Sequence, residues 1–209
     1  MSPKELLWVL FEEVVSPKLR ELGFSPVASA FSFKRSRGDF VQLISINLGR
    51  QNTQDNIHFW SAFNVKSPKY ARWLKKQGRE AVGVYVGGCP HWNIPTWRIP
   101  GDSATSYYIS GDAMRCSVVE DWLGRCLISG LPYLDQLSSW EGAAQDLVRR
   151  KWHWNEAADF YLIAGQVDRA AETLATGVEL LESKNLSWAE SDHPTIRRKA
   201  ASAEPRKRH

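Results

Sequence analysis

The first twenty residues carry apolar side chains at helical spacing. The residues that recur every three or four positions are Leu7, Leu10, Phe11 and Val14. Before them, Ser2-Pro3-Lys4-Glu5 is typical of a helix start, because Ser can cap the first turn and Glu can complete a capping box. We expect a helix over residues 3–22, broken or restarted near Pro17 and capped by Gly23.

The apolar pattern then changes to a period of two, which is typical of β-strands. Alternation over 31–35, the turn Arg37-Gly38-Asp39 and the β-rich segment 40–48 predict two paired strands. Apolar residues on both faces of 40–48 indicate a strand that is covered on both sides, at least at its start. Residues 57–65 form a third strand, and Tyr107-Tyr108-Ile109 form the last one. Short connections favour an antiparallel meander.

Further helices follow these strands. Ser67-Pro68 begins one whose two sides differ, with Tyr70, Trp73, Leu74 and Gln77 on one side and Lys69, Arg72, Lys76 and Arg79 on the other. Asp112 is the expected cap of a second helix with a buried stripe of Cys116, Val119, Leu123, Cys126 and Gly130. Helices are also expected over 131–139 and 141–151, and short extended pieces over 82–86 and 96–99. The fold class predicted is α+β, with an antiparallel sheet of about four or five strands and a helical C-terminal third.

A helical hairpin is predicted at about 154–183. Small and large residues stand at the offsets of one tetratricopeptide repeat, namely Trp154, Ala157, Ala158, Tyr161, Ala170, Leu174 and Gly177. Gly165 is expected to end its first helix and Asp168 to cap its second. A single repeat cannot bury its own face, so we expect it to close the core or to pack on a partner.

Length and composition set the domain plan. A chain of 209 residues supports one core with a helical appendage. We expect an α+β domain over 1–151, the hairpin packed on it over 152–186, and a disordered basic tail over 187–209. The longest apolar run, Leu6 to Phe11, is far shorter than the roughly 20 residues of a membrane span. Three cysteines and no export signal favour a reduced, cytoplasmic protein with two cysteines in its core.

Several of these segments together resemble a bacterial family, domain-of-unknown-function family 4304. The resemblance covers roughly residues 4–140 and rests on Leu22-Gly23-Phe24, Phe33-Lys34-Arg35, the strands 41–44 and 59–65, His91-Trp92, Trp97-Arg98-Ile99, Tyr107-Tyr108-Ile109 and Gly130-Leu131-Pro132-Tyr133-Leu134-Asp135. The long helical extension and the basic tail depart from the family pattern. The resemblance implies an α+β fold and brings no catalytic residues with it.

The middle of the chain is strongly basic. Residues 34–79 hold ten Lys or Arg and two Asp, which gives +8 from a whole-chain charge of +4. The residues expected to form a partner-binding surface are Arg35, Arg37, Lys69, Arg72, Trp73, Lys76 and Arg79, with Trp60 and Tyr70 as further aromatic groups for stacking. Such a surface suits an acidic protein or a nucleic acid, or it serves only as a solvated face.

Motifs of catalysis and metal binding are missing from the sequence. It contains no phosphate-binding loop ending in GK[ST], no HExxH and no GxSxG. Cys89-Pro90-His91 lacks a second ligand pair, and His58 beside Trp60 could act as a base only if Asp39 or Asp55 lay opposite. We therefore expect no cofactor, no metal and no catalytic residues, and leave open a site assembled only in three dimensions. The function expected is a non-catalytic interaction module of the immunity or antitoxin kind, bound to an acidic protein and not to a membrane; the alternative is a nucleic-acid-binding accessory protein.

Overall fold

A computed structural model describes residues 1–79, 85–89, 106–151 and 153–184. The chain forms two compact units, Met1–Ser138 and Ser139–His209. The division thus falls before residue 140, whereas the sequence analysis placed it at 151. The expected strands at 96–99 and the expected basic tail lie outside the described residues, as does most of 82–86. Within the described ranges no helix has the length and apolar content needed to cross a membrane.

The N-terminal helix forms as predicted, with a local widening. α1 (Pro3–Leu10) passes into a π-helical segment (Phe11–Val15) and then into α2 (Ser16–Glu21). The capping box is present, since the Glu5 amide donates to Ser2 Oγ over 3.2 Å and the Ser2 amide donates to the Glu5 carboxylate over 2.6 Å. Gly23 ends the helix with a positive φ of 83°.

A second helix repeats this pattern further along the chain. α4 (Arg115–Arg125) passes into a π-helical segment (Cys126–Gly130) and then into α5 (Leu131–Leu137). Each π segment ends two residues before a proline, at Pro17 and at Pro132. A proline ring collides with the carbonyl four residues earlier and offers no N–H to it, and that carbonyl lies inside the π segment in both cases. The wider turn accommodates the proline without ending the helix.

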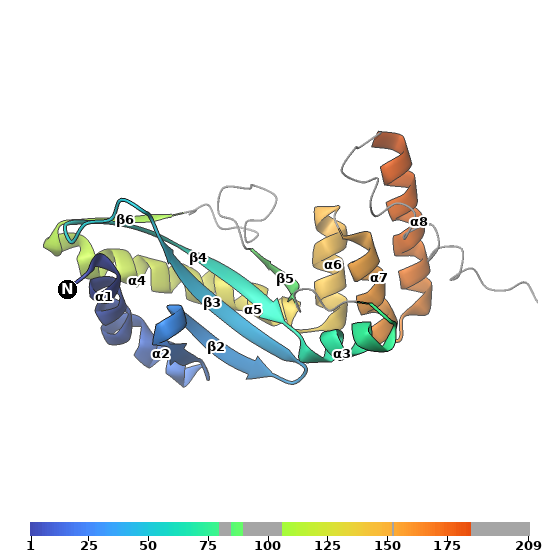
Figure 1. Cartoon of the computed structure of the whole chain (residues 1–209), viewed down its shortest axis with the longest axis horizontal. Helices are drawn as coiled ribbons and strands as arrows, with labels where there is room; N and C mark the ends of the chain where they lie inside the picture. The colour runs from blue at the N-terminus through green and yellow to red at the C-terminus, as the bar shows by residue number, and fades with distance from the viewer. Residues whose placement is uncertain (80–84, 90–105, 152, 185–209) are drawn as a thin grey trace, which may run out of the picture. The chain divides into compact units, whose positions relative to one another are not determined.

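One antiparallel sheet runs through the first unit. Its strands are β1 (Ser25–Val27), β2 (Ser32–Arg37), β3 (Phe40–Leu48), β4 (Asn56–Lys66), β5 (Tyr85–Cys89) and β6 (Tyr107–Ser110). They follow the order β1-β2-β3-β4-β5, and β6 also pairs with β4. β5 and β6 occupy the same edge of β4, opposite its last and first residues respectively. The α+β class with an antiparallel sheet and a helical C-terminal region is confirmed (Figure 1).

Helices pack against one face of this sheet. Phe11 lies edge-on to Phe59 of β4, with ring centroids 5.8 Å apart, and against Trp122 of α4 at 4.9 Å. The indole of Trp122 donates to Ser61 Oγ over 2.8 Å, so its polar atom is satisfied inside the core. Gly130 lies so close to the Phe63 ring that a Cβ there would be 2.4 Å from a ring carbon.

The described helices that pack on the sheet, namely the N-terminal helix, α4 and α5, leave its opposite face uncovered. Burial alternates along β3, where Gln42 and Ile44 are buried while Val41 and Leu43 are only half-buried. The outward side of β3 is therefore only partly covered, whereas the sequence pattern predicted cover on both sides, at least at the start of the strand. We call this side, formed by the outward-facing residues of β2, β3, β4 and β6, the open face.

The buried stripe of α4 differs from the expected one. Cys116 is exposed and Trp122 is buried in the core, while Val119, Cys126 and Gly130 are buried as expected. The sequence spacing fits either Trp122 or Leu123 on the inner side, and the larger ring takes that place. Burial raises the pKa of the Cys126 thiol far above its ordinary value. Asp112 does not cap α4; it begins a 3₁₀ turn and forms an ion pair with Arg115.

The second unit contains the predicted hairpin. α6 (Trp140–Arg150) packs against α7 (Trp154–Ile163), and α7 packs against α8 (Val167–Lys184). All seven residues predicted at repeat positions are buried. Gly177 of α8 lies against the Trp154 ring of α7, and Asp168 lies in the first turn of α8 and not at its cap. The hairpin thus buries one side against α6, a neighbour that the sequence analysis assigned to the first domain.

Gly130 and Gly124 provide a matched test of the helix–sheet contact. Gly130→Ala should lower the free energy of unfolding by about 1–3 kcal/mol, because the added methyl group overlaps the Phe63 ring. Gly124→Ala, in the preceding helix with no atom within 4 Å of the added carbon, should leave stability unchanged or raise it slightly. Urea unfolding of the two variants measures the difference, and equal effects would contradict the close approach.

Candidate functional site

Two of the expected partner-binding residues belong to an internal polar network. The Arg35 guanidinium donates to Asp135 of α5 over 2.6 Å, to Gln42 of β3 over 2.7 Å and to the Leu22 carbonyl over 2.9 Å. It also lies over the Phe24 ring at 4.5 Å, and its side chain is only 12% exposed. Arg35 therefore ties the end of α2 to β2, β3 and α5, which is a structural task.

Asp135 is the acceptor at the centre of this network. Its carboxylate accepts from Arg35, from Arg37 over 2.6 Å and from Gln42 over 2.9 Å. Gln42 donates in addition to Ser138 Oγ over 2.8 Å. Burial by itself would raise the pKa of Asp135, but the hydrogen bonds from Gln42 and Arg37 and the two positive charges outweigh it and hold this pKa below its ordinary value.

The other expected residues lie on or beside α3 (Pro68–Lys76). Ser67 caps this helix as predicted, accepting from the Tyr70 amide over 3.2 Å, and Tyr70 and Leu74 are buried. Lys69 forms an ion pair with Asp39 over 2.7 Å. Arg72, Lys75 and Lys76 are exposed, and Arg79 after the helix end is half-buried. Since α3 contains four bases and no acid, its solvent side is a concentrated positive surface, which we call the α3 surface.

The aromatic residues of α3 are not arranged as a stacking platform. Tyr70 is buried, and the half-buried Trp73 stacks on it with ring centroids 6.1 Å apart and an interplanar angle of 21°. One side of each ring is therefore used inside the protein. The α3 surface offers charge with a partly accessible indole at its edge.

A second group of rings lies at the other end of β4, on the open face, with Tyr108 exposed and His58 and Trp60 half-buried. His58 of β4 lies opposite Tyr108 of β6, and their rings are stacked with centroids 4.4 Å apart and an angle of 4°. Trp60 follows on the same face, with its ring 5.5 Å from that of His58. Tyr108 is 62% exposed. We call these two stacked side chains, His58 and Tyr108, the ring pair.

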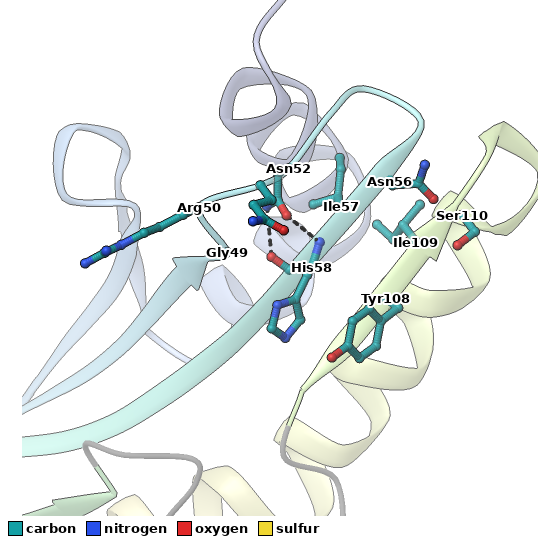
Figure 2. Close-up of a pocket in the computed structure, with 10 residues that line it drawn as sticks. Gly49, Arg50, Asn52, Asn56, Ile57, His58, Tyr108, Ile109 and Ser110 are labelled. Atoms are coloured by element: carbon teal, nitrogen blue, oxygen red, sulfur yellow. Dashed lines mark hydrogen bonds between the residues drawn. The ribbon is translucent and has the colours of Figure 1, made fainter.

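A cavity of about 450 Å³ adjoins the ring pair. The ring pair forms one wall of the cavity, and the loop after β3, which carries Arg50, Gln51 and Asn52, forms the other (Figure 2). The rim includes Asn56 and Ser110. None of the described residues that line this cavity is acidic.

Hydrogen bonds fix the loop that forms the cavity wall. The Asn52 side chain accepts from the His58 amide and donates to the His58 carbonyl, both over 2.9 Å (Figure 2). The Gly49 amide donates to that same carbonyl over 2.9 Å. The base of the loop is tied to β6 by the Gly111 amide, which donates to the Asp55 carbonyl over 2.7 Å. The cavity is therefore formed in advance of any ligand.

The geometry does not assemble the acid–base pair considered for His58. Asp39 lies in the β2–β3 turn beside α3, at the opposite end of β4 from His58, and it holds Lys69. Asp55 lies in the loop before β4, where its backbone carbonyl accepts a hydrogen bond from the Gly111 amide. In the part of the chain that the structure describes, no three His, Cys, Asp or Glu side chains gather as a metal site requires.

The sequence analysis singled out His58 and Trp60 but did not find their neighbour. It expected Tyr108 only as part of a strand, because the pairing of β6 with β4 joins residues about fifty positions apart. The alternation of Tyr108 with the buried Ile109 was the signal for an outward-facing ring.

Comparison of the chain with models of known families, with curated proteins and with solved structures finds no match. The resemblance to family 4304 therefore stays a hypothesis based on the residues, and the functional argument depends on the geometry alone.

The Asp135 network predicts a specific acid sensitivity. Since the pKa of Asp135 is lower in the folded chain than its ordinary 3.8, its stabilisation is fully present above about pH 4 and is lost as the pH falls through the folded value. Asp135→Asn should remove this part of the pH dependence. It should also lower the free energy of unfolding at neutral pH by about 1–3 kcal/mol, because Arg35 loses its counter-charge.

Urea unfolding at several pH values between neutrality and about pH 3 measures both effects. The exposed Asp55→Asn is the control and should follow the wild type. An unchanged acid slope in Asp135→Asn would contradict the role of the network.

Proposed function

We propose that this protein is a non-catalytic interaction module that binds an acidic surface of another protein through the α3 surface. The observation that carries the proposal is the charge imbalance of α3. Arg72, Lys75 and Lys76 are exposed and form no ion pair with any described residue, and the three lie within one short helix. Other exposed bases either have a counter-charge, as Lys18 has in Glu21, or stand singly, as Lys4 and Arg50 do.

The residue types on α3 support a protein partner. Arg and Trp are enriched among the residues that dominate binding energy in protein interfaces. Trp73 lies at the border between the buried side of α3 and its basic side, half-buried and stacked on Tyr70, so its indole is held rigid. A rigid aromatic side chain loses little conformational entropy on binding, while the neighbouring charges speed the encounter with an acidic partner.

The biological setting that we favour is that of an immunity or antitoxin protein, which neutralises an acidic surface of its target. This setting is an analogy with other small interaction domains and depends on no particular contact. The candidate binding residues are Lys69, Arg72, Trp73, Lys76 and Arg79, with Lys75 added. Arg35 and Arg37 contribute their charge mainly to Asp135.

A nucleic acid is the second candidate for this surface. The observation that favours it is the charge of the open face, which carries Lys34 on β2 and Lys66 on β4 and has no Asp or Glu at an outward-facing position of β2, β3, β4 or β6. Together with the α3 surface these lysines could contact phosphates.

Charge reversal on α3 tests the proposal. Arg72→Glu combined with Lys76→Glu should slow association with the captured partner about tenfold or more at low salt, and should change its dissociation little, because charges at an interface rim act mainly on encounter. Lys4→Glu combined with Lys18→Glu changes the net charge equally on α1 and α2 and should have little effect. Affinity capture from the native cell followed by surface-based kinetics provides both rates.

Two results would contradict the protein proposal. One is an association rate that both double variants reduce equally, since net charge alone would then explain it. The other is submicromolar binding of single-stranded or duplex oligonucleotides at roughly 200 mM salt that is lost in the α3 variant, which would favour the nucleic acid.

A further inference from the structure

The ring pair and its cavity suggest a second binding site, separate from the α3 surface. The two features lie at opposite ends of β4, since α3 follows Lys66 while His58 stands near the first residue, Asn56. Nothing in the proposed interaction through α3 uses the rings, the loop or the cavity.

The exposure of Tyr108 is unusual for a side chain of its size in this structure. It belongs to a strand whose neighbouring residue, Ile109, is 1% exposed, and it stands beside a preformed cavity. A cross-strand stack with His58 holds the ring in one orientation. The result is a flat aromatic surface that is rigid and accessible to solvent.

The cavity lining defines the chemistry of a ligand. Its volume of about 450 Å³ lies within the range of small-molecule sites. The amides of Gln51 and Asn56 and the hydroxyl of Ser110 offer both donors and acceptors, while Asn52 is used in fixing the loop. A planar ring with donors and acceptors along its edge matches this lining better than an aliphatic ligand does.

The charged residues near the cavity also indicate which chemical groups a ligand would carry. Arg50 is in the lining, and among the described residues that line the cavity there is no acid. Lys34 and Lys66 are on the same face but toward the other end of β4. A negative group attached to the planar ring is therefore favoured. Figure 2 shows the Arg50 side chain extending away from the ring pair, so base and phosphate would be held at separate points.

From these observations we infer that the ring pair and the adjoining cavity bind a nucleobase that carries a phosphate. The base stacks on Tyr108, its edge faces the amide side chains of the cavity, and Arg50 contacts a phosphate. Two sources share this chemistry, a free nucleotide and a nucleotide within a single strand, and the experiment separates them.

The test titrates the full chain with three probes. Adenosine monophosphate is followed by calorimetry, and a labelled single-stranded oligonucleotide of about ten nucleotides is followed by fluorescence anisotropy. Ribose 5-phosphate carries the same phosphate without the base. Binding of both base-containing probes identifies the free nucleotide as sufficient, and binding of the oligonucleotide alone identifies the single strand as the source.

Tyr108→Ala and Tyr108→Phe test the stacking. Loss of the exposed ring should weaken binding roughly 5- to 150-fold, which is the range for removing one base–aromatic stack. Tyr108→Phe should bind like the wild type, because the ring remains. Circular dichroism and urea unfolding check that both variants keep the fold, which the 62% exposure of Tyr108 leads us to expect.

The α3 double variant separates this site from the proposed protein interface. Arg72→Glu with Lys76→Glu should bind adenosine monophosphate, or the oligonucleotide if it alone binds, within about twofold of the wild type. Three outcomes would overturn the inference: no binding of either base-containing probe, equal binding of ribose 5-phosphate, or unchanged affinity in a folded Tyr108→Ala.

Discussion

The contacts of Phe11 with Phe59 and with Trp122 determine on which side of the sheet the N-terminal helix and α4 lie. These three rings join the N-terminal helix, α4 and β4 in one aromatic cluster. The hydrogen bond from Trp122 to Ser61 fixes the depth at which the indole enters. Because α4, α5 and the N-terminal helix pack on this face, the outward-facing residues of β2, β3, β4 and β6 have none of these helices as a cover. The ring pair and the lysines of the open face depend on this one-sided packing.

The basic residues in the middle of the chain fall into two groups, one paired within the fold and one exposed to solvent. Arg35 and Arg37 share Asp135, and through Gln42 they join β2, β3 and α5 into one network. Arg72, Lys75 and Lys76 have no such counter-charge among the described residues, although they belong to the same basic stretch of sequence. A basic composition therefore does not by itself define a binding surface. Whether a basic residue is available to a partner depends on whether the fold brings a carboxylate close to it.

Local elements of this fold were predictable because their causes are local. The capping box at Ser2, the cap at Ser67 and the alternation along β4 depend on residues a few positions apart. The predictions that were wrong concern residues whose burial depends on a partner far away in the sequence. Trp122, and not Cys116, reaches the core because Phe11 and Ser61 receive it, and Gln42 is buried because Asp135 and Ser138 lie within hydrogen-bond distance.

The candidate sites show the same limit. The basic side of α3 could be read from the helical spacing, because all of its residues lie on one short helix. That Arg35 does not belong to this surface could not be predicted from the sequence, since its partner Asp135 is a hundred positions away. The ring pair was equally hidden, because the register of β6 against β4 follows from no local pattern.

Cysteine reactivity at two adjacent positions of β3 tests the one-sided packing most directly. In a chain with Cys89 and Cys116 replaced by Ser, Leu43→Cys on the open face should react rapidly with a thiol reagent, and Ile44→Cys on the helix-covered face should react only after unfolding. The buried Cys126 remains as an internal reference for unfolding. Rapid reaction at 43 with protection at 44 is the result that this account predicts. Equal protection at both positions would show that the open face is covered and would contradict it.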